Sequence, residues 1–113
     1  MHDLTDRTAP VVSAYLEAHA ARDVDAALGA FTPTAVVTDD GRTYRGTQEV
    51  RAFLSRAGAE FTYTTTLVSA ERTDASGWVA VQRLEGDFPG GEAVLRYRFT
   101  LDGDRIAVLV VAP

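Results

Sequence analysis

Hydrophobic residues recur at helical spacing in the first half of the chain. Between residues 8 and 20, bulky side chains follow the i, i+3, i+4, i+7 pattern of one helix face: Val12, Tyr15, Leu16 and His19. Asp23 is a good N-cap for a second, short helix from Val24 to about Ala30. Thr47 can cap a third helix, which ends just before Gly58 and again gathers one apolar face: Val50, Phe53, Leu54 and Ala57.

After Gly58 the hydrophobic pattern changes from helical to alternating. Turn residues separate four alternating stretches, which we expect to be strands: 61–68, 78–88, 93–101 and 106–111. An earlier strand is predicted at 35–38, with Asp39, Asp40 and Gly41 as the turn that follows it. The pattern therefore predicts an α+β domain in which three helices of the N-terminal half cover an antiparallel sheet.

Composition restricts the classes to which the chain can belong. Its 113 residues suffice for a single domain over 1–113, and its hydrophobic and charged fractions, 46% and 24%, are those of globular proteins. No stretch approaches the roughly 20 apolar residues of a membrane span. The first residues do not resemble a signal peptide, and cysteine is absent, so we expect a cytoplasmic protein without membrane contact.

The charges exclude several kinds of chemistry. A net charge of -5 repels phosphate backbones, so we expect no nucleic-acid partner. All eleven basic residues are arginine, which leaves no lysine amine for a Schiff base. With no cysteine and only His2 and His19, a metal site has little support, and we expect no metal and no other cofactor.

Several short motifs of the first half, together with the order of elements, carry a family resemblance: Val11-Val12-x-x-Tyr15, Arg22-Asp23-Val24-Asp25, Phe31, Ala35-Val36-Val37-Thr38-Asp39 and Gly41-Arg42-Thr43-Tyr44-Arg45-Gly46. With them the chain resembles the nuclear transport factor 2-like superfamily, and within it the SnoaL-like and ketosteroid isomerase-like proteins. The resemblance implies a cone in which helices lie across a strongly curved sheet around one pocket, often in a homodimer.

The resemblance also implies roles for individual residues. Asp39 falls where ketosteroid isomerases have the carboxylate that moves a proton, and Tyr15 falls where they have a tyrosine that hydrogen-bonds the enolate oxygen. Their third group, a protonated acid, falls at or near Leu95, which cannot donate a hydrogen bond. Losing one such donor costs on the order of 100-fold to 1,000-fold in rate, which argues against the usual steroid isomerisation. The plainer alternative for Asp39 is a turn residue that bonds its own backbone.

Six further residues are candidate ligand contacts: His19, Phe53, Trp78, Gln82, Leu95 and Tyr97. His19 lies one turn beyond Tyr15 on the same helix face, where it is either a proton relay or a structural histidine. Trp78 and Gln82 share one face of a strand, and Gln82 becomes a rare polar group of the pocket if that face turns inward. On the following strand, Arg96 and Arg98 alternate with the apolar residues, which predicts a solvated or dimer-facing row.

Three functions are compatible with these features. The first is a cofactor-independent acid–base enzyme, such as an isomerase or cyclase, that acts on a small hydrophobic carbonyl compound with Asp39 as base and Tyr15 as donor. The second is a non-catalytic module that binds a hydrophobic metabolite. The third is a dimerisation module whose cavity is filled by its own side chains.

Overall fold

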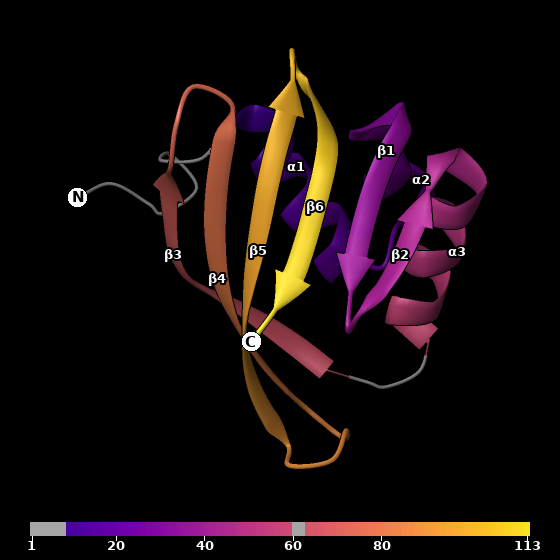
Figure 1. Cartoon of the computed structure of the whole chain (residues 1–113). Coiled ribbons are helices and arrows are strands. Elements are labelled where there is room, and N and C mark those ends of the chain that lie inside the picture. Colours follow the sequence, from indigo (N-terminus) through magenta and orange to yellow (C-terminus); the bar gives the residue numbers. More distant parts are fainter. Residues whose placement is uncertain (1–8, 60–62) are drawn as a thin grey trace.

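The computed structural model describes residues 9–59 and 63–113, and the side chains of 57–59 are outside this description. Figure 1 shows one sheet with the helices behind it on a single face. The elements in chain order are α1 (Pro10–Ala20), α2 (Val24–Gly29), β1 (Phe31–Asp39), β2 (Arg42–Arg45), α3 (Gly46–Ala59), β3 (Tyr63–Arg72), β4 (Gly77–Gly86), β5 (Glu92–Asp102) and β6 (Arg105–Ala112). No helix within the described ranges is long and apolar enough to cross a membrane.

The six strands form one sheet in the order β2-β1-β6-β5-β4-β3. The last four strands are joined by hairpins and pair antiparallel, as the alternating pattern predicts. β1 and β6, the first and the last strand of the chain, lie side by side and are parallel, so the sheet is mixed rather than purely antiparallel. The α+β class is confirmed, and this long-range pairing is the feature that local sequence patterns did not predict.

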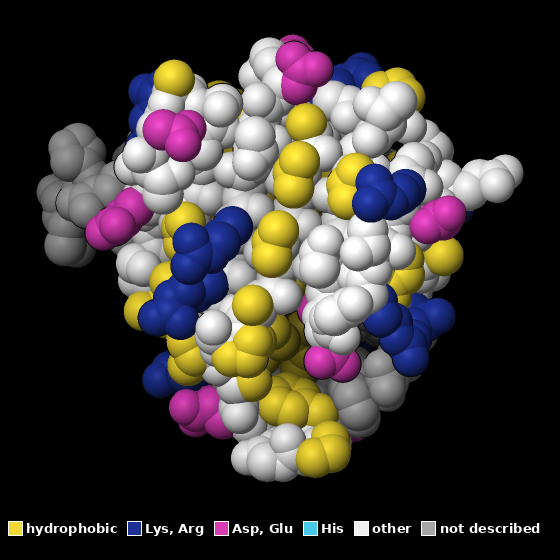
Figure 2. Space-filling model, viewed as in Figure 1, with side chains coloured by type: hydrophobic (Ala, Val, Ile, Leu, Met, Phe, Trp, Pro, Cys, Tyr) yellow, Lys and Arg dark blue, Asp and Glu magenta, His cyan; other side chains and the backbone are white. Residues whose placement is uncertain are grey.

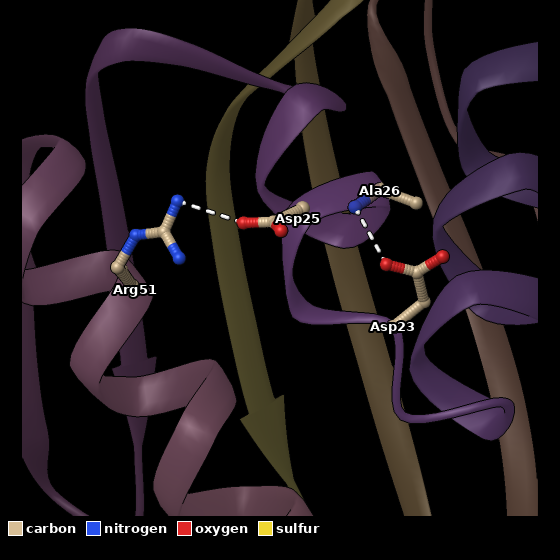
Figure 3. Close-up of polar contacts among 4 residues, drawn as sticks. All are labelled: Asp23, Asp25, Ala26 and Arg51. Atoms are coloured by element: carbon tan, nitrogen blue, oxygen red, sulfur yellow. Dashed lines mark hydrogen bonds and ion pairs between the residues drawn. The ribbon is translucent and has the colours of Figure 1, made fainter.

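The second and third helices begin as their local hydrogen bonds dictate. Asp23 caps α2, because its Oδ1 accepts the backbone N–H of Ala26 at 3.1 Å (Figure 3). α3 begins at Gly46 rather than after Thr47. Its first turn is held by Glu49, whose Oε1 accepts the backbone N–H of Arg45 at 2.9 Å.

The C-terminal end of α3 departs from the expected one. The helix continues to Ala59, so the expectation that it ends before Gly58 is wrong. A glycine inside a helix costs about 1 kcal/mol relative to alanine, which the packing of the preceding turns can offset. Val50, Phe53 and Leu54 provide that packing and are all buried.

The core lies between the helices and the inner face of the sheet. α1 contributes the face expected from its spacing, with four buried side chains: Val12, Tyr15, Leu16 and His19. Alternate residues of β4 and β5 meet them from the sheet: Ala80, Gln82, Leu84, Tyr97 and Phe99. Three arginines that alternate with these positions, Arg83, Arg96 and Arg98, are exposed on the outer face, and for Arg96 and Arg98 this agrees with the row that the alternation predicts.

The N-cap of α2 can be tested through stability. We expect Asp23→Ala to lower the free energy of unfolding by about 1 kcal/mol, because the N–H of Ala26 loses its acceptor. Asp25→Ala is the control, since Asp25 forms an exposed ion pair with Arg51 at 2.9 Å (Figure 3) and removing it costs less than about 0.5 kcal/mol. Urea unfolding measures both, and equal losses would contradict the capping role.

Candidate active site

A hollow with a volume of about 580 Å³ lies at one end of the described sheet. It is bounded by the start of β3, the β4–β5 hairpin, the ends of β1 and β6, and the helices. Twelve residues line it: His19, Asp39, Asp40, Phe53, Tyr63, Leu84, Phe88, Pro89, Ala93, Leu95, Tyr97 and Val111. In Figure 2, hydrophobic side chains lie deep in a hollow beside the projecting hairpin. The volume is in the usual range of small-molecule sites.

Asp39 is placed in this hollow by the strand on which it lies. Side chains of a strand alternate between its two faces, so Asp39 shares the inner face with Ala35 and Val37, which are fully buried. The turn then consists of Asp40 and Gly41 alone, with φ angles of 52° and 76°. Two successive positive φ values are typical of the two-residue turns that join antiparallel strands. Asp39 is therefore the last residue of β1 and not a residue of the turn itself.

The environment of Asp39 shifts the pKa of its carboxyl group upward. Burial raises the pKa of the carboxyl group above its ordinary value of 3.8, and the negative charge of Asp40 raises the pKa further. No ion-pair partner of Asp39 is present among residues 9–56 and 63–113. A half-buried carboxylate with a raised pKa can accept a proton closer to neutral pH than a solvated one.

Tyr15 lies behind the wall of the pocket. Its ring is fully buried and packs edge-on against Phe31 and Phe99, with centroid distances of 5.4 and 5.7 Å. Its hydroxyl group is buried and has no hydrogen-bond partner within the described part of the chain. A buried tyrosine hydroxyl usually finds a partner, so this one is an unused donor.

Residues that line the pocket influence the pKa of the Tyr15 hydroxyl. Burial raises the pKa of Tyr15 well above 10, and Tyr97, Tyr63 and Asp39 raise it further, in that order. All three of these residues line the hollow, whereas Tyr15 itself does not. The donor predicted from the sequence thus lies close to the charged and polar groups of the site without contacting the empty volume.

His19 joins α1 to the pocket through a tyrosine of β3. Its Nε2 lies 3.3 Å from the Tyr63 hydroxyl, and its ring stacks on Tyr15 at 5.7 Å. Arg22 fixes Tyr63 from the other side: its guanidinium lies 5.3 Å from the ring centroid and donates to the Tyr63 carbonyl at 3.2 Å. Arg22 has a φ of 59°, a backbone conformation that is uncommon outside glycine.

This arrangement favours the neutral form of the His19 imidazole. Burial lowers the pKa of His19 below 6.5, and the nearby charge of Arg22 lowers the pKa further. In the unfolded chain the imidazole regains its ordinary pKa, so the unfolded state binds the proton more tightly. The fold therefore loses stability as the pH falls below about 6.5 and through the lower pKa of the folded state.

Of the five remaining predicted contacts, three line the hollow, one lies behind its wall and one is separated from the site. Phe53, Leu95 and Tyr97 line the hollow together with His19 and Asp39. Gln82 is buried with 4% exposure behind the wall, where its side chain hydrogen-bonds that of Tyr97.

Trp78 is separated from the site. It pairs with Phe99 and follows the β3–β4 turn, six residues before Leu84, which lines the pocket. At a rise of about 3.3 Å per residue, the two positions are roughly 20 Å apart along β4. Trp78 shares the inner face with Gln82, as the alternation predicts, but it packs against the core at the opposite end of the strand.

Seven of the twelve lining residues were not among the predicted site residues: Asp40, Tyr63, Leu84, Phe88, Pro89, Ala93 and Val111. Tyr63 lies on the same strand face as Thr65 and Leu67, which are two and four residues further along β3. The two-residue period of the strand could therefore have indicated that Tyr63 points inward. Phe88 lies in the β4–β5 connection, where no periodic pattern exists, and it packs edge-on against Tyr63 at 6.5 Å. Asp40 was expected in a solvated turn, and it is exposed at the rim of the pocket.

Comparison with protein families agrees with this architecture. A family model described as a SnoaL-like domain matches residues 12–111. No functionally curated protein shows significant similarity to the chain.

Solved structures of the same fold extend the comparison. A protein from Sinorhizobium meliloti proposed to be a polyketide cyclase is 27% identical, with a TM-score of 0.90 over 98% of this chain and 100% of its own. A ketosteroid isomerase-like protein from Catenulispora acidiphila, in complex with trimethylamine, is 18% identical, with a TM-score of 0.81 over 94% of this chain and 87% of its own. A Mycobacterium tuberculosis protein in complex with estradiol-17beta-hemisuccinate is 16% identical, with a TM-score of 0.76 over 91% and 90%.

The effect of Arg22 on His19 can be measured directly. We expect Arg22→Gln to raise the pKa of His19, because a nearby positive charge is removed, while burial keeps the pKa below 6.5. Titration of the imidazole by ¹H–¹³C NMR measures the shift. Arg51→Gln, which removes an arginine from the exposed pair with Asp25, is the control and leaves the pKa of His19 unchanged. The same shift in both variants would contradict the local role of Arg22.

Proposed function

Because the chain belongs to the SnoaL-like family, we propose that it is a cofactor-independent acid–base enzyme that acts on a small hydrophobic carbonyl compound. Isomerisation and cyclisation are the two reaction types that fit this chemistry. Asp39 serves as the base and Tyr15 as the hydrogen-bond donor. The observation that carries the proposal is the half-buried carboxylate of Asp39, whose pKa is raised, at the wall of a largely apolar cavity.

The proposed reaction begins with proton abstraction. The Asp39 carboxylate takes a proton from the carbon beside the carbonyl group, and the electron pair of that C–H bond moves to form an enolate. The Tyr15 hydroxyl lies behind the wall, so the part of the wall that separates it from the cavity has to move when the substrate binds. The hydroxyl then donates a hydrogen bond to the enolate oxygen and stabilises its charge. Protonated Asp39 then returns the proton to a different carbon in an isomerisation. In a cyclisation the enolate carbon attacks a second carbonyl group, the C=O bond of that group opens to an alkoxide, and the alkoxide takes the proton from Asp39. The unused hydroxyl of Tyr15 supports this role.

The compared proteins support a pocket for small molecules. The Catenulispora acidiphila and Mycobacterium tuberculosis proteins were each solved with a small ligand. The Sinorhizobium meliloti protein was proposed to be a polyketide cyclase, a reaction class in which enolates of carbonyl compounds form carbon–carbon bonds. These likenesses agree with a small-molecule site, while the reaction on this chain rests on Asp39 and its surroundings.

A non-catalytic binding module is the second candidate, and one observation favours it. Leu95 lines the cavity at the position where the isomerases that this chain resembles have a second acid. Without that acid the pocket has fewer groups that can stabilise an enolate. A module whose cavity is filled by its own side chains is the weakest candidate, because a volume of about 580 Å³ is open.

A homodimer belongs to the same proposal. The outer face of the sheet carries Val68 and Val94 with 51% and 47% exposure, and such side chains favour burial against a second copy. Light scattering of the purified protein at several concentrations distinguishes a dimer from a monomer, and a mass of about 12 kDa throughout would refute the dimer.

The role of Asp39 can be tested once a substrate is known, for example from native mass spectrometry of metabolites that copurify. We expect Asp39→Asn to lower kcat at least about 100-fold, because the amide cannot accept the proton. In the unchanged protein, kcat should fall with decreasing pH through an apparent pKa above 3.8, as Asp39 becomes protonated. The matched control is Asp104→Asn on the β5–β6 turn, and a loss below about tenfold in Asp39→Asn would refute the base.

Tyr15→Phe separates a functional hydroxyl from a structural one. Because this hydroxyl has no partner among the described residues, we expect its removal to leave the free energy of unfolding unchanged or slightly higher. We expect kcat to fall on the order of 100-fold if the hydroxyl stabilises the enolate. Thermal unfolding and turnover of the same preparation measure both effects. A variant with lower stability and full activity would contradict the assignment.

A further inference from the structure

The described wall of the pocket carries negative charge without a positive counterpart. Asp39 and Asp40 contribute two carboxylates, and none of the described arginines is among the lining residues. His19 is the nitrogen base of this wall, and it is neutral at pH 7 because burial and Arg22 lower its pKa. The ligand that this wall accepts therefore meets two acids directly, while the guanidinium of Arg22 stays outside the lining, 5.3 Å from the centroid of the Tyr63 ring.

The negative charges of these two carboxylates are not balanced by ion pairs within the described part of the chain. The described ion pairs of the protein join Arg51 to Asp25 at 2.9 Å and Arg83 to Glu85 at 3.3 Å, on the exposed surface. Neither Asp39 nor Asp40 has an ion-pair partner in the described part of the chain. Adjacent like charges that lack a cation are unfavourable, and a positively charged ligand would relieve this repulsion.

Aromatic rings make up much of the remaining wall. Four of the lining residues are aromatic: Phe53, Tyr63, Phe88 and Tyr97. The faces of such rings attract cations, and clusters of them recognise substituted ammonium groups. The Tyr63 ring already interacts with a cation of the protein itself, because the Arg22 guanidinium lies 5.3 Å from its centroid. Arg22 does not line the cavity, so the volume inside remains free for a ligand.

We propose that the pocket binds a tertiary or quaternary ammonium group between the carboxylates of Asp39 and Asp40 and the aromatic wall. This inference rests on the proposed function, because it names the substrate class of the same pocket: a hydrophobic carbonyl compound that also carries a substituted ammonium group. Asp40 is exposed at the rim and can pair with the cation. Asp39, which is more buried, then remains available as the base.

Three probes of nearly equal shape test the charge preference: choline, 3,3-dimethylbutan-1-ol and 3,3-dimethylbutanoate. They carry a positive charge, no charge and a negative charge, respectively. NMR chemical-shift titration of the full chain gives the affinity and the location of each. We expect choline to bind at least about tenfold more tightly than the alcohol, because a cation–π contact and an ion pair are added. We expect the carboxylate to bind least. Equal affinities, the reverse order or no shifts at pocket residues would overturn the inference.

Asp40→Asn tests whether the acids cause the preference. Asparagine tolerates the φ of 52° at this position, so the turn is retained. We expect the affinity for choline to fall at least about fivefold and the affinity for the neutral alcohol to stay within twofold, which also shows that the pocket is intact. Asp104→Asn makes the same charge change on the exposed β5–β6 turn and should affect neither probe. Equal losses in the two variants would overturn the inference.

The two proposals fail in different experiments. If Asp39→Asn retains turnover, the enzymatic role of Asp39 is wrong, whatever the order of the three probes. If the probes do not rank by charge, the ammonium inference is wrong, whatever the turnover of Asp39→Asn. A pocket that prefers choline in a protein without a catalytic base would support an ammonium-binding module.

Discussion

The alternation of inward and outward side chains along β1 is the constraint on which the site depends. It places Ala35 and Val37 in the core and carries Asp39 to the same face at the end of the strand. The two-residue turn at Asp40 and Gly41 stops the strand immediately afterwards. A shift of register by one residue would turn Asp39 to the outer face and remove the carboxylate from the cavity. The pairing of β1 with β6 holds this register.

Packing and electrostatics then act on the same few groups. Helix α1 fills the core with Tyr15 and presents His19 to the pocket, where Tyr63 continues the wall and Arg22 packs on the Tyr63 ring from outside the cavity. The cost is an unsatisfied hydroxyl, a half-buried acid and an arginine with a positive φ. Unfavourable features of this kind concentrate where proteins bind ligands, because the surrounding fold provides the stability to hold them.

Local patterns in the sequence were sufficient for much of the architecture. Helical spacing located the buried face of α1, and the side chain of Asp23 identified the start of α2. Alternation along β4 put Gln82 and Arg83 on opposite faces, and the structure decides that the face of Gln82 is the buried one. The start and end of α3 were less well predicted, because the bond from Arg45 to Glu49 and the packing of the helix, rather than Thr47 and Gly58, decide them.

The sequence by itself determined the α+β class, the buried face of α1 and the alternation along the strands, since each depends on residues close together in the chain. Tertiary structure alone decided which of these residues share a cavity. The parallel pairing of β1 with β6 joins segments more than 70 residues apart, such as Asp39 and Val111. It brings Asp39 beside Val111, while the length of β4 separates Trp78 from the pocket that Leu84 lines. Such distances depend on strand register and curvature, which no local pattern contains.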